Sequence, residues 1–226
     1  MMNKILFGDC RETLKTIDVK ARMCVTSPPY YGLRNYGDEE KQIGMEQTPE
    51  EYIEQLVDVF RSVRDVLTDD GTLWLNIGDT YYNYRSDGNY PKQTVSRTKQ
   101  DLPDFSPVRG NKLHNLKSKD LIGIPWMLAF ALRADGWWLR QDIIWNKPNP
   151  MPESVKDRCT KSHEYIFLLS KSKQYFYDNE AIKEPVKQDW GTRDRTNGKY
   201  HNPGSGLAPH SGLSKSYDRK NKRSVW

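Results

Sequence analysis

Short apolar runs followed by turn residues mark strands near the start of the chain. Ile5–Phe7 is followed by Gly8-Asp9, and Met23–Val25 is followed by Thr26-Ser27-Pro28-Pro29. Glycine and proline after a short apolar run are typical of a strand that ends in a turn. We therefore predict two strands here, each with a turn at its end.

The strongest local signal predicts an amphipathic helix. Thr48-Pro49-Glu50-Glu51 supplies an N-cap hydroxyl, a proline at the first helical position and a glutamate three residues after the cap. Apolar side chains then recur at helical spacing from Ile53 to Leu67, which predicts one buried face. Asp69-Asp70-Gly71 is expected to end the helix. Thr72–Ile77 follows as a mostly buried strand that ends at Gly78-Asp79.

The second half of the chain repeats the strand–helix–strand pattern. We predict a helix over Pro125–Arg133 and a strand over Trp137–Trp145. Two further strands are expected at Tyr165–Leu169 and Tyr175–Tyr177, joined as a hairpin across Ser170–Gln174. Strands that alternate with helices predict the α/β fold class, with a mainly parallel sheet covered on both faces.

Two basic segments interrupt this pattern and divide the chain. Residues 83–120 hold eight Lys and Arg against four Asp and Glu, and residues 183–226 hold ten against four. We predict one α/β domain built from residues 1–82 and 121–182. Residues 83–120 would form a basic loop insertion, and residues 183–226 a basic segment or linker rich in Gly, Ser and Asn.

Composition narrows the class of protein. The chain has 226 residues and a net charge of +5, which suits a nucleic-acid partner without requiring one. No apolar run approaches the roughly 18 residues that span a bilayer, and the first residues lack a signal-peptide core, so we expect a cytoplasmic protein. The cysteines, Cys10, Cys24 and Cys159, lack metal-ligand spacing, so we expect reduced thiols and no metal.

The loop Ser27-Pro28-Pro29-Tyr30 is the main candidate for chemistry. It follows a predicted strand, which is where ligands bind in open α/β sheets, and its two prolines make the chain stiff. The oxygens of Ser27 and Pro28 can accept both hydrogens of a planar amino group while Tyr30 stacks on the ring. Accepting these hydrogens returns the nitrogen lone pair for attack on an electrophilic methyl group. The alternative is a turn that merely ends a strand.

The ordered motifs resemble those of a known enzyme family. Gly8-Asp9-Cys10 and Ser27-Pro28-Pro29-Tyr30 are followed by Thr72–Asp79, Ile143–Asn149 and Ser162–Phe167. This set resembles the DNA amino-methyltransferases of the circularly permuted beta class, found in restriction–modification systems and phages. The resemblance covers most of residues 4–178 and implies a Rossmann-like fold that uses S-adenosylmethionine.

The resemblance implies a role for each matching position. Ser27, Pro28, Pro29 and Tyr30 would hold the flipped base and its amino group as the catalytic residues. Asp9, Cys10 and Thr26 would lie at the cofactor, with no metal and no covalent intermediate. Double-stranded DNA is the implied partner, together with a cognate restriction enzyme. Residues 1–82 and 121–182 would be catalytic, and residues 183–226 occupy the usual target-recognition position.

The target base and the acid–base residues stay open at this level. Serine at the first motif position resembles the cytosine-N4 members more than the adenine-N6 members, but either side chain can accept from an amino group. The basic residues of 83–120 predict phosphate contacts or a solvated loop. His163-Glu164 predicts either an acid–base pair or a structural start to a strand, and we favour the second interpretation.

One expected part of the family pattern is absent from the sequence. The resemblance implies a glycine-rich cofactor loop, usually Asp-Pro-Phe-x-Gly-x-Gly, but Gly204-Ser205-Gly206-Leu207 lacks a preceding strand and is interpreted as a linker. In the implied sheet order 3-2-1-4-5-7-6, strands 1 and 2 would be absent. We therefore expect an incomplete fold, which is either a fragment or one half of a split enzyme whose second chain supplies the missing loop. A catalytically inactive DNA-binding fragment is the main rival hypothesis.

Overall fold

The computed structural model describes residues 4–33, 42–82, 115–186 and 219–226. Contacts divide the chain into one unit of residues up to Phe176 together with Ser224–Trp226, and a second unit, Tyr177–Arg223. The division lies six residues before the domain boundary predicted at 182/183. Within the second unit, β5 (Glu184–Pro185) pairs in antiparallel fashion with β6 (Arg219–Lys220). The catalytic role predicted for residues 1–82 and 121–182, and the roles predicted for the basic segments 83–120 and 183–226, stay predictions.

The first unit contains short and long helices and four strands. In chain order they are α1 (Cys10–Thr13), the 3-10 helix η1 (Leu14–Thr16), β1 (Ala21–Thr26), α2 (Pro49–Val66), β2 (Leu67–Ile77), α3 (Ile124–Ala134), β3 (Trp138–Asn146) and β4 (His163–Ser170). Four predicted strands and both predicted helices are therefore found, each within five residues of its expected bounds. The strand predicted over Tyr165–Leu169 lies within β4.

Helix α2 begins as its sequence predicts. The Thr48 hydroxyl accepts from the Glu51 amide at 3.2 Å, and the Glu51 carboxylate accepts from the Thr48 amide at 3.1 Å. This reciprocal capping box satisfies two backbone donors that the first turn would leave unpaired. The predicted stop at residues 69–71 is wrong, because the helix ends at Val66 and these residues already lie within β2.

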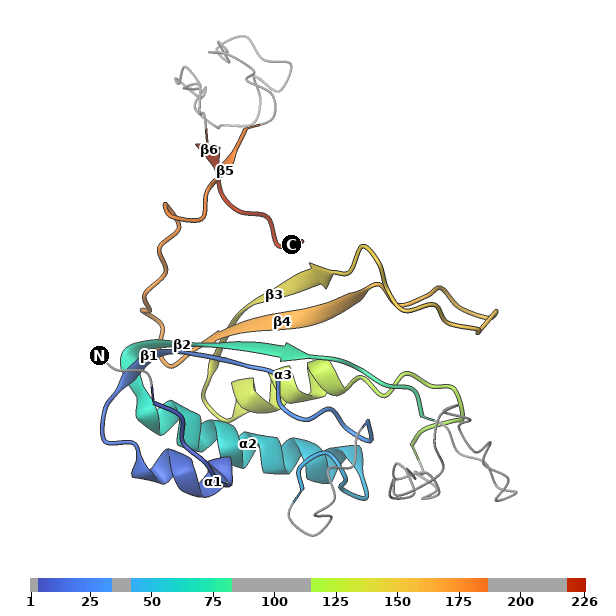
Figure 1. Cartoon of the computed structure of the whole chain (residues 1–226), viewed down its shortest axis with the longest axis horizontal. Helices are drawn as coiled ribbons and strands as arrows, with labels where there is room; N and C mark the ends of the chain where they lie inside the picture. Colours follow the sequence, from blue (N-terminus) through green and yellow to red (C-terminus); the bar gives the residue numbers. More distant parts are fainter. Residues whose placement is uncertain (1–3, 34–41, 83–114, 187–218) are drawn as a thin grey trace, which may run out of the picture. The chain divides into compact units, whose positions relative to one another are not determined.

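The four strands form a mixed sheet in the order β1-β2-β4-β3 (Figure 1). β1 and β2 are parallel, whereas β4 runs antiparallel to both β2 and β3. The order corresponds to the 4-5-7-6 part of the family order. The expectation of a mainly parallel sheet is wrong for the described strands, because β3 and β4 are joined without a helical crossover.

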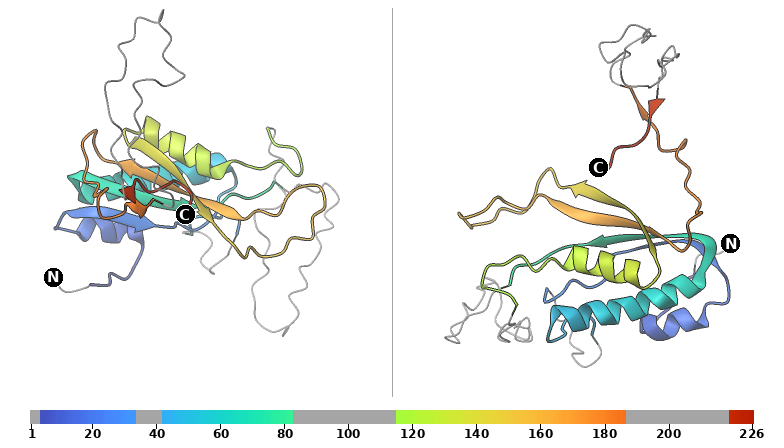
Figure 2. Two further views of the ribbon diagram at one scale, coloured as in Figure 1. Left: turned by 90° about the horizontal axis from the view of Figure 1, so that it is seen from above. Right: turned by 180° about the vertical axis from the view of Figure 1, so that it is seen from behind.

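The helices of the first unit lie together on one face of the sheet, as the two views in Figure 2 show. Leu73, Leu75 and Phe167 point to that face and are fully buried. On the opposite face, Met23 and Val25 are 57% and 69% exposed. The expectation of two covered faces is therefore wrong for the described part of the chain.

Two predicted strands do not form. Ile5–Phe7 has no strand structure, and Phe7 is 89% exposed, because no described strand lies beside it to satisfy its backbone groups. Tyr175–Tyr177 is also irregular, so the predicted hairpin is absent. β4 pairs instead with β2 and β3, whose longer apolar runs bury more surface.

No helix in the described part of the chain is long and apolar enough to cross a membrane. The core lies between the sheet and the helices α2 and α3, where Phe60, Leu128 and Phe167 are at most 2% exposed. This core holds β1 and β2 in register, and so it positions the loop that follows β1.

Replacing Phe60 with alanine should destabilise the fold by about 3–5 kcal/mol, because the change opens a cavity in a close-packed core. Phe130 on α3 is the matched control, since 45% of its side chain is exposed. Phe130→Ala should cost less than about 1.5 kcal/mol. Urea unfolding of both variants measures the difference, and equal losses would contradict the location of the core.

Candidate active site

The Ser27–Tyr30 loop lies at the carboxyl end of β1, beside the carboxyl end of β2. The two strands are parallel, with Thr26 paired to Leu75, so the residues that follow each strand meet at one edge of the sheet. Ser27 and Pro29 are exposed there, while Pro28 and Tyr30 are half-buried. The structure thus brings the four predicted catalytic residues together at the edge where α/β proteins bind ligands.

The hydroxyl of Tyr30 is tied to two other strands. It lies 3.0 Å from the Asn76 side-chain oxygen on β2 and 3.0 Å from a Glu164 carboxylate oxygen at the start of β4. Ser27 donates a longer hydrogen bond of 3.4 Å to the same hydroxyl. Asn76 is itself oriented by donating to the Tyr165 carbonyl at 3.1 Å. These bonds fix the phenol in one position.

Glu164 is held as a carboxylate between a cation and the phenol. Its other oxygen accepts from Lys147, which follows β3 and forms an ion pair with it. Burial opposes ionisation, but hydrogen bonds from Lys147, Tyr30 and Asn76 outweigh it and lower the pKa of Glu164 below its ordinary value. Burial, together with the charge of Glu164, raises the pKa of the Tyr30 phenol to about 12. At neutral pH the pair is a phenol and a carboxylate.

The backbone of the loop is braced from behind. Tyr52, fully buried on α2, donates from its hydroxyl to the Pro29 carbonyl at 2.7 Å. Gly44 packs against Pro29 and Tyr30, and its φ of +102° is a conformation that favours glycine. No described residue donates a hydrogen bond to the Pro28 carbonyl. That oxygen and the exposed Ser27 hydroxyl are the acceptors that the loop offers to a ligand.

Gly78 and Asp79, which follow β2, hold the Tyr30 ring and the start of α3 in position. A Cβ atom at Gly78 would lie 2.5 Å from the Tyr30 ring, so only glycine allows the ring to lie against β2. The Asp79 carboxylate accepts from the backbone amides of Gly123 and Ile124 at 3.0 and 3.1 Å. Amides at the start of a helix have no partner within the helix, and Asp79 accepts from these two. Asp79 therefore anchors α3 to the site.

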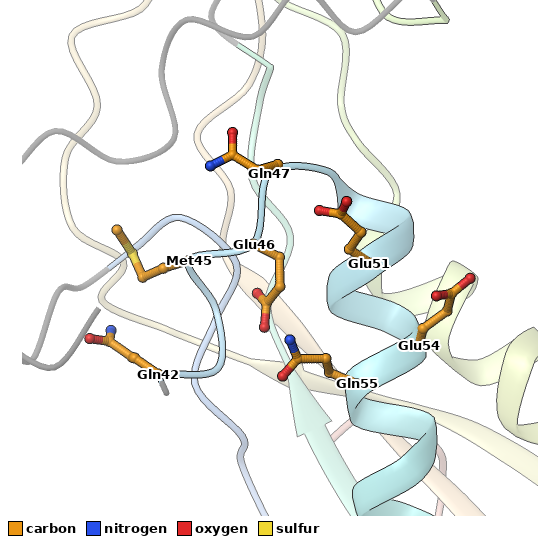
Figure 3. Close-up of a pocket in the computed structure, with 7 residues that line it drawn as sticks. All are labelled: Gln42, Met45, Glu46, Gln47, Glu51, Glu54 and Gln55. Atoms are coloured by element: carbon orange, nitrogen blue, oxygen red, sulfur yellow. The ribbon is translucent and has the colours of Figure 1, made fainter. Parts of the chain in front are cut away.

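A pocket of about 410 Å³ lies between α2 and the segment that contains Gly44 (Figure 3). Its lining residues carry mainly carboxylate and carboxamide groups: Gln42, Met45, Glu46, Gln47, Glu51, Glu54 and Gln55. One oxygen of Glu46 accepts from the Gly44 amide, and the other is buried without a partner among the described residues. Burial raises the pKa of Glu46 above its ordinary value. The lining is therefore rich in hydrogen-bond acceptors.

The predicted cofactor residues occupy two places. Thr26 is the last residue of β1, directly before the loop. Asp9 is the N-cap of α1, where its carboxylate accepts from the amide and the guanidinium of Arg11, and Cys10 is exposed beside it. Arg11 also reaches the Gln55 side chain at 3.5 Å, so Asp9 is linked through one residue to the pocket lining.

Several predicted features lie outside the described residues. They include the loop around Gly204 and most of the basic segments 83–120 and 183–226. Within the described ranges, no group of three or more His, Cys, Asp and Glu side chains is arranged to hold a metal ion.

A protein family described as DNA methylase, covering N6 and N4 methyltransferases, matches residues 21–226. The chain belongs to this family. The type II methyltransferase M.SmaI of Serratia marcescens is 48% identical over 224 residues, which are 99% of this chain and 65% of that protein. M.XycI of Xanthomonas campestris pv. cyanopsidis is 52% identical over 189 residues, which are 83% of this chain and 60% of that protein. The resemblance drawn from the motifs is confirmed at the level of the DNA amino-methyltransferase family, and the permuted class remains a prediction.

The fold is also that of a solved methyltransferase. The PvuII DNA methyltransferase (cytosine-N4-specific) matches with a TM-score of 0.50 at 17% identity, over 77% of this chain and 51% of that chain. This likeness confirms the Rossmann-like α/β fold that the motifs imply. The chain spans 60% to 65% of the length of the two curated relatives.

Sequence reasoning missed the residues that hold Tyr30. The sequence places Asn76 in a predicted buried strand and Glu164 at a structural start to a strand, and Lys147 enters only as part of the motif Ile143–Asn149. The structure brings all three to the Tyr30 hydroxyl or its immediate partner. One signal in the sequence could have found Asn76, because this polar residue interrupts an otherwise apolar run near the carboxyl end of a predicted strand.

The Gly78 contact makes a testable prediction. Gly78→Ala should force the Tyr30 ring away from β2 and cost about 1–3 kcal/mol of unfolding free energy, as overpacking does. In a Tyr30→Ala background the same change should cost little, because the ring that it meets has been removed. A double-mutant cycle by urea unfolding measures the coupling. Additive effects would contradict the contact.

Proposed function

We propose that this chain is the catalytic part of a site-specific DNA methyltransferase that modifies the exocyclic amino group of a flipped base, cytosine N4. The observation that carries this proposal is the braced Ser27–Tyr30 loop, which presents acceptor oxygens beside an aromatic ring at the ligand-binding edge of the sheet. Membership of the DNA methylase family supports the choice of DNA as substrate.

The loop is suited to activating an aromatic amine. The amine is a poor nucleophile while its lone pair is conjugated with the ring. The Ser27 hydroxyl and the Pro28 carbonyl would each accept one amino hydrogen, which draws the nitrogen toward tetrahedral geometry and returns the lone pair for attack. Because Tyr52 and Gly44 brace the loop, these oxygens are held in place before the substrate arrives.

Tyr30 would form the wall on which the extruded base stacks. Moving a base out of the duplex costs a few kcal/mol of stacking and pairing, which an aromatic platform and phosphate contacts offset. The ring is well suited to this, since its hydroxyl is fixed by Asn76 and Glu164 and cannot swing away. The phosphate contacts are proposed for the basic segments 83–120 and 183–226, the second as target-recognition segment.

S-adenosylmethionine would bind on the Asp9 side of the loop. When bound, it supplies an electrophilic methyl group on a positively charged sulfur. Asp9, Cys10 and Thr26 are proposed to hold it, and the neighbouring acceptor-rich pocket fits the charge of its ammonium group through the buried unpaired oxygen of Glu46. No metal is proposed to take part.

Cytosine N4 is proposed over adenine N6 because the first loop residue is Ser27, as in the cytosine-N4 members that the motif resembles. Adenine N6 is the alternative, since a hydroxyl accepts equally well from either amine. A catalytically inactive fragment that only binds DNA is the second candidate, since the basic residues of 83–120 and 183–226 suit phosphate contacts without requiring methyl transfer. We also propose that the chain acts in the cytoplasm and that it has a cognate restriction enzyme as partner.

The proposal is tested with the 226-residue chain, duplex DNA and methyl-labelled S-adenosylmethionine. Ser27→Ala should lower the transfer of label to DNA by about 10²-fold, the size expected for a lost catalytic group. DNA affinity, measured by fluorescence anisotropy, should change less than about twofold, because the hydroxyl acts on the flipped base and not on the phosphates.

The matched control is Ser62→Ala, which removes a hydroxyl from the surface of α2 where it bonds only its own helix. This variant should retain both turnover and DNA binding. Equal losses of turnover and DNA binding in Ser27→Ala would contradict the role assigned to the loop. DNA binding by the wild-type chain without any transfer of label would favour the inactive fragment.

A further inference from the structure

A hydrogen-bonded chain leads away from the amine-binding loop. The Ser27 hydroxyl donates to the Tyr30 hydroxyl at 3.4 Å, and the Tyr30 hydroxyl lies 3.0 Å from the Glu164 carboxylate. The far oxygen of that carboxylate is paired with Lys147. Four side chains from three separate parts of the sequence therefore connect an exposed hydroxyl to a largely covered carboxylate, 18% of whose side chain is exposed.

We propose that Glu164 is a positioning residue that orients Tyr30 and, through Tyr30 and Ser27, takes up the proton that the amine loses on methylation. This inference rests on the proposed function, because it concerns the same site and reaction. It assigns a role to a carboxylate that the motif comparison treats only as part of a strand.

The proton balance requires an acceptor of this kind. When the amine nitrogen bonds the methyl carbon, the carbon–sulfur bond of the sulfonium donor breaks and its electron pair stays on sulfur. The nitrogen then carries a positive charge and loses one proton to the Ser27 oxygen. Ser27 passes its own proton to the Tyr30 oxygen, and Tyr30 passes its proton to Glu164. The carboxylate ends as a carboxylic acid, and both hydroxyls are restored.

Only Glu164 among the linked groups can be the end of this path. An amide such as Asn76 has no basic site in water, and Lys147 is already a cation. A carboxylate whose pKa is lowered by its neighbours is a weak base. It still suffices, because the lone pair of the cytosine amino group is conjugated into an electron-poor ring, so the nitrogen with a fourth bond is a far stronger acid than a carboxylic acid. The ion pair with Lys147 keeps the acceptor ionised until the proton arrives.

The charge environment sets the expected pH dependence. Glu164 faces Lys147 from the end of β3, Tyr30 from the loop after β1 and Asn76 from β2. The relay needs the carboxylate form, so kcat should fall as the pH drops through the pKa of Glu164. Removing the cation with Lys147→Met raises that pKa, and the acidic limb of the profile should move to higher pH.

The first test does not depend on turnover. The Glu164 carboxyl carbon is followed by NMR in protein labelled with carbon-13 at glutamate Cδ, with Glu164→Gln to assign the signal. Its titration midpoint should rise in Tyr30→Phe, which removes the phenol donor but keeps the ring, and in Lys147→Met. An unchanged midpoint in Tyr30→Phe would show that no proton path joins the two groups, and would overturn the inference.

The second test measures steady-state methylation. Glu164→Gln keeps the shape and an acceptor for Tyr30 but removes the base, so kcat should fall by about 10²-fold with KM for DNA nearly unchanged. Glu12→Gln, which breaks the exposed ion pair with Lys15 on α1, is the matched control and should retain wild-type kcat. Wild-type kcat in Glu164→Gln, or an acidic limb that Lys147→Met leaves in place, would overturn the relay.

The two tests separate the inference from the proposed function. A wild-type chain that transfers no methyl group contradicts the proposed function for this chain, whatever Glu164 does. The NMR titration then decides the inference. A Glu164 midpoint that rises in Tyr30→Phe supports the proposed path, and an unchanged midpoint overturns it.

Discussion

The hydrogen bonds of the Tyr30 hydroxyl are the interaction on which the site depends. They join the loop after β1 to Asn76 on β2 and Glu164 on β4. Because polar groups with low exposure must be satisfied, the two bonds together constrain β1, β2 and β4. The ion pair with Lys147 extends the constraint to the end of β3. A loop that would otherwise be an ordinary turn becomes a rigid surface with two acceptor oxygens.

The core makes this constraint possible. Leu73, Leu75 and Phe167 pack against α2 and α3, and this burial fixes the register of the strands that carry the polar side chains. A slip of one residue would turn Asn76 to the helical face and remove a partner of Tyr30. The acceptor-rich pocket lies on the same α2 scaffold as Tyr52, so base and cofactor sites would share one rigid support.

Local chemistry in the sequence was enough to predict α2, α3 and the four strands β1 to β4, because caps and periodicity act over a few residues. The position of the Ser27–Tyr30 loop was also predictable, since two prolines after a strand leave few conformations. The strand at Ile5–Phe7 and the parallel sheet were wrong because strand formation depends on distant partners. Glu164 and Lys147 were missed for the same reason: 134 residues separate Glu164 from Tyr30, and no local pattern records such a contact.

The proposed role of the Ser27–Tyr30 loop is to activate the exocyclic amine of cytosine in DNA. The most direct measurement incubates the chain with duplex DNA and S-adenosylmethionine, digests the DNA and identifies the nucleosides by mass spectrometry. The account predicts N4-methylcytosine, which distinguishes this chemistry from carbon methylation by its fragmentation. Methylation at carbon 5 of cytosine would contradict the account, because that reaction attacks through carbon and has no use for acceptors around an amine.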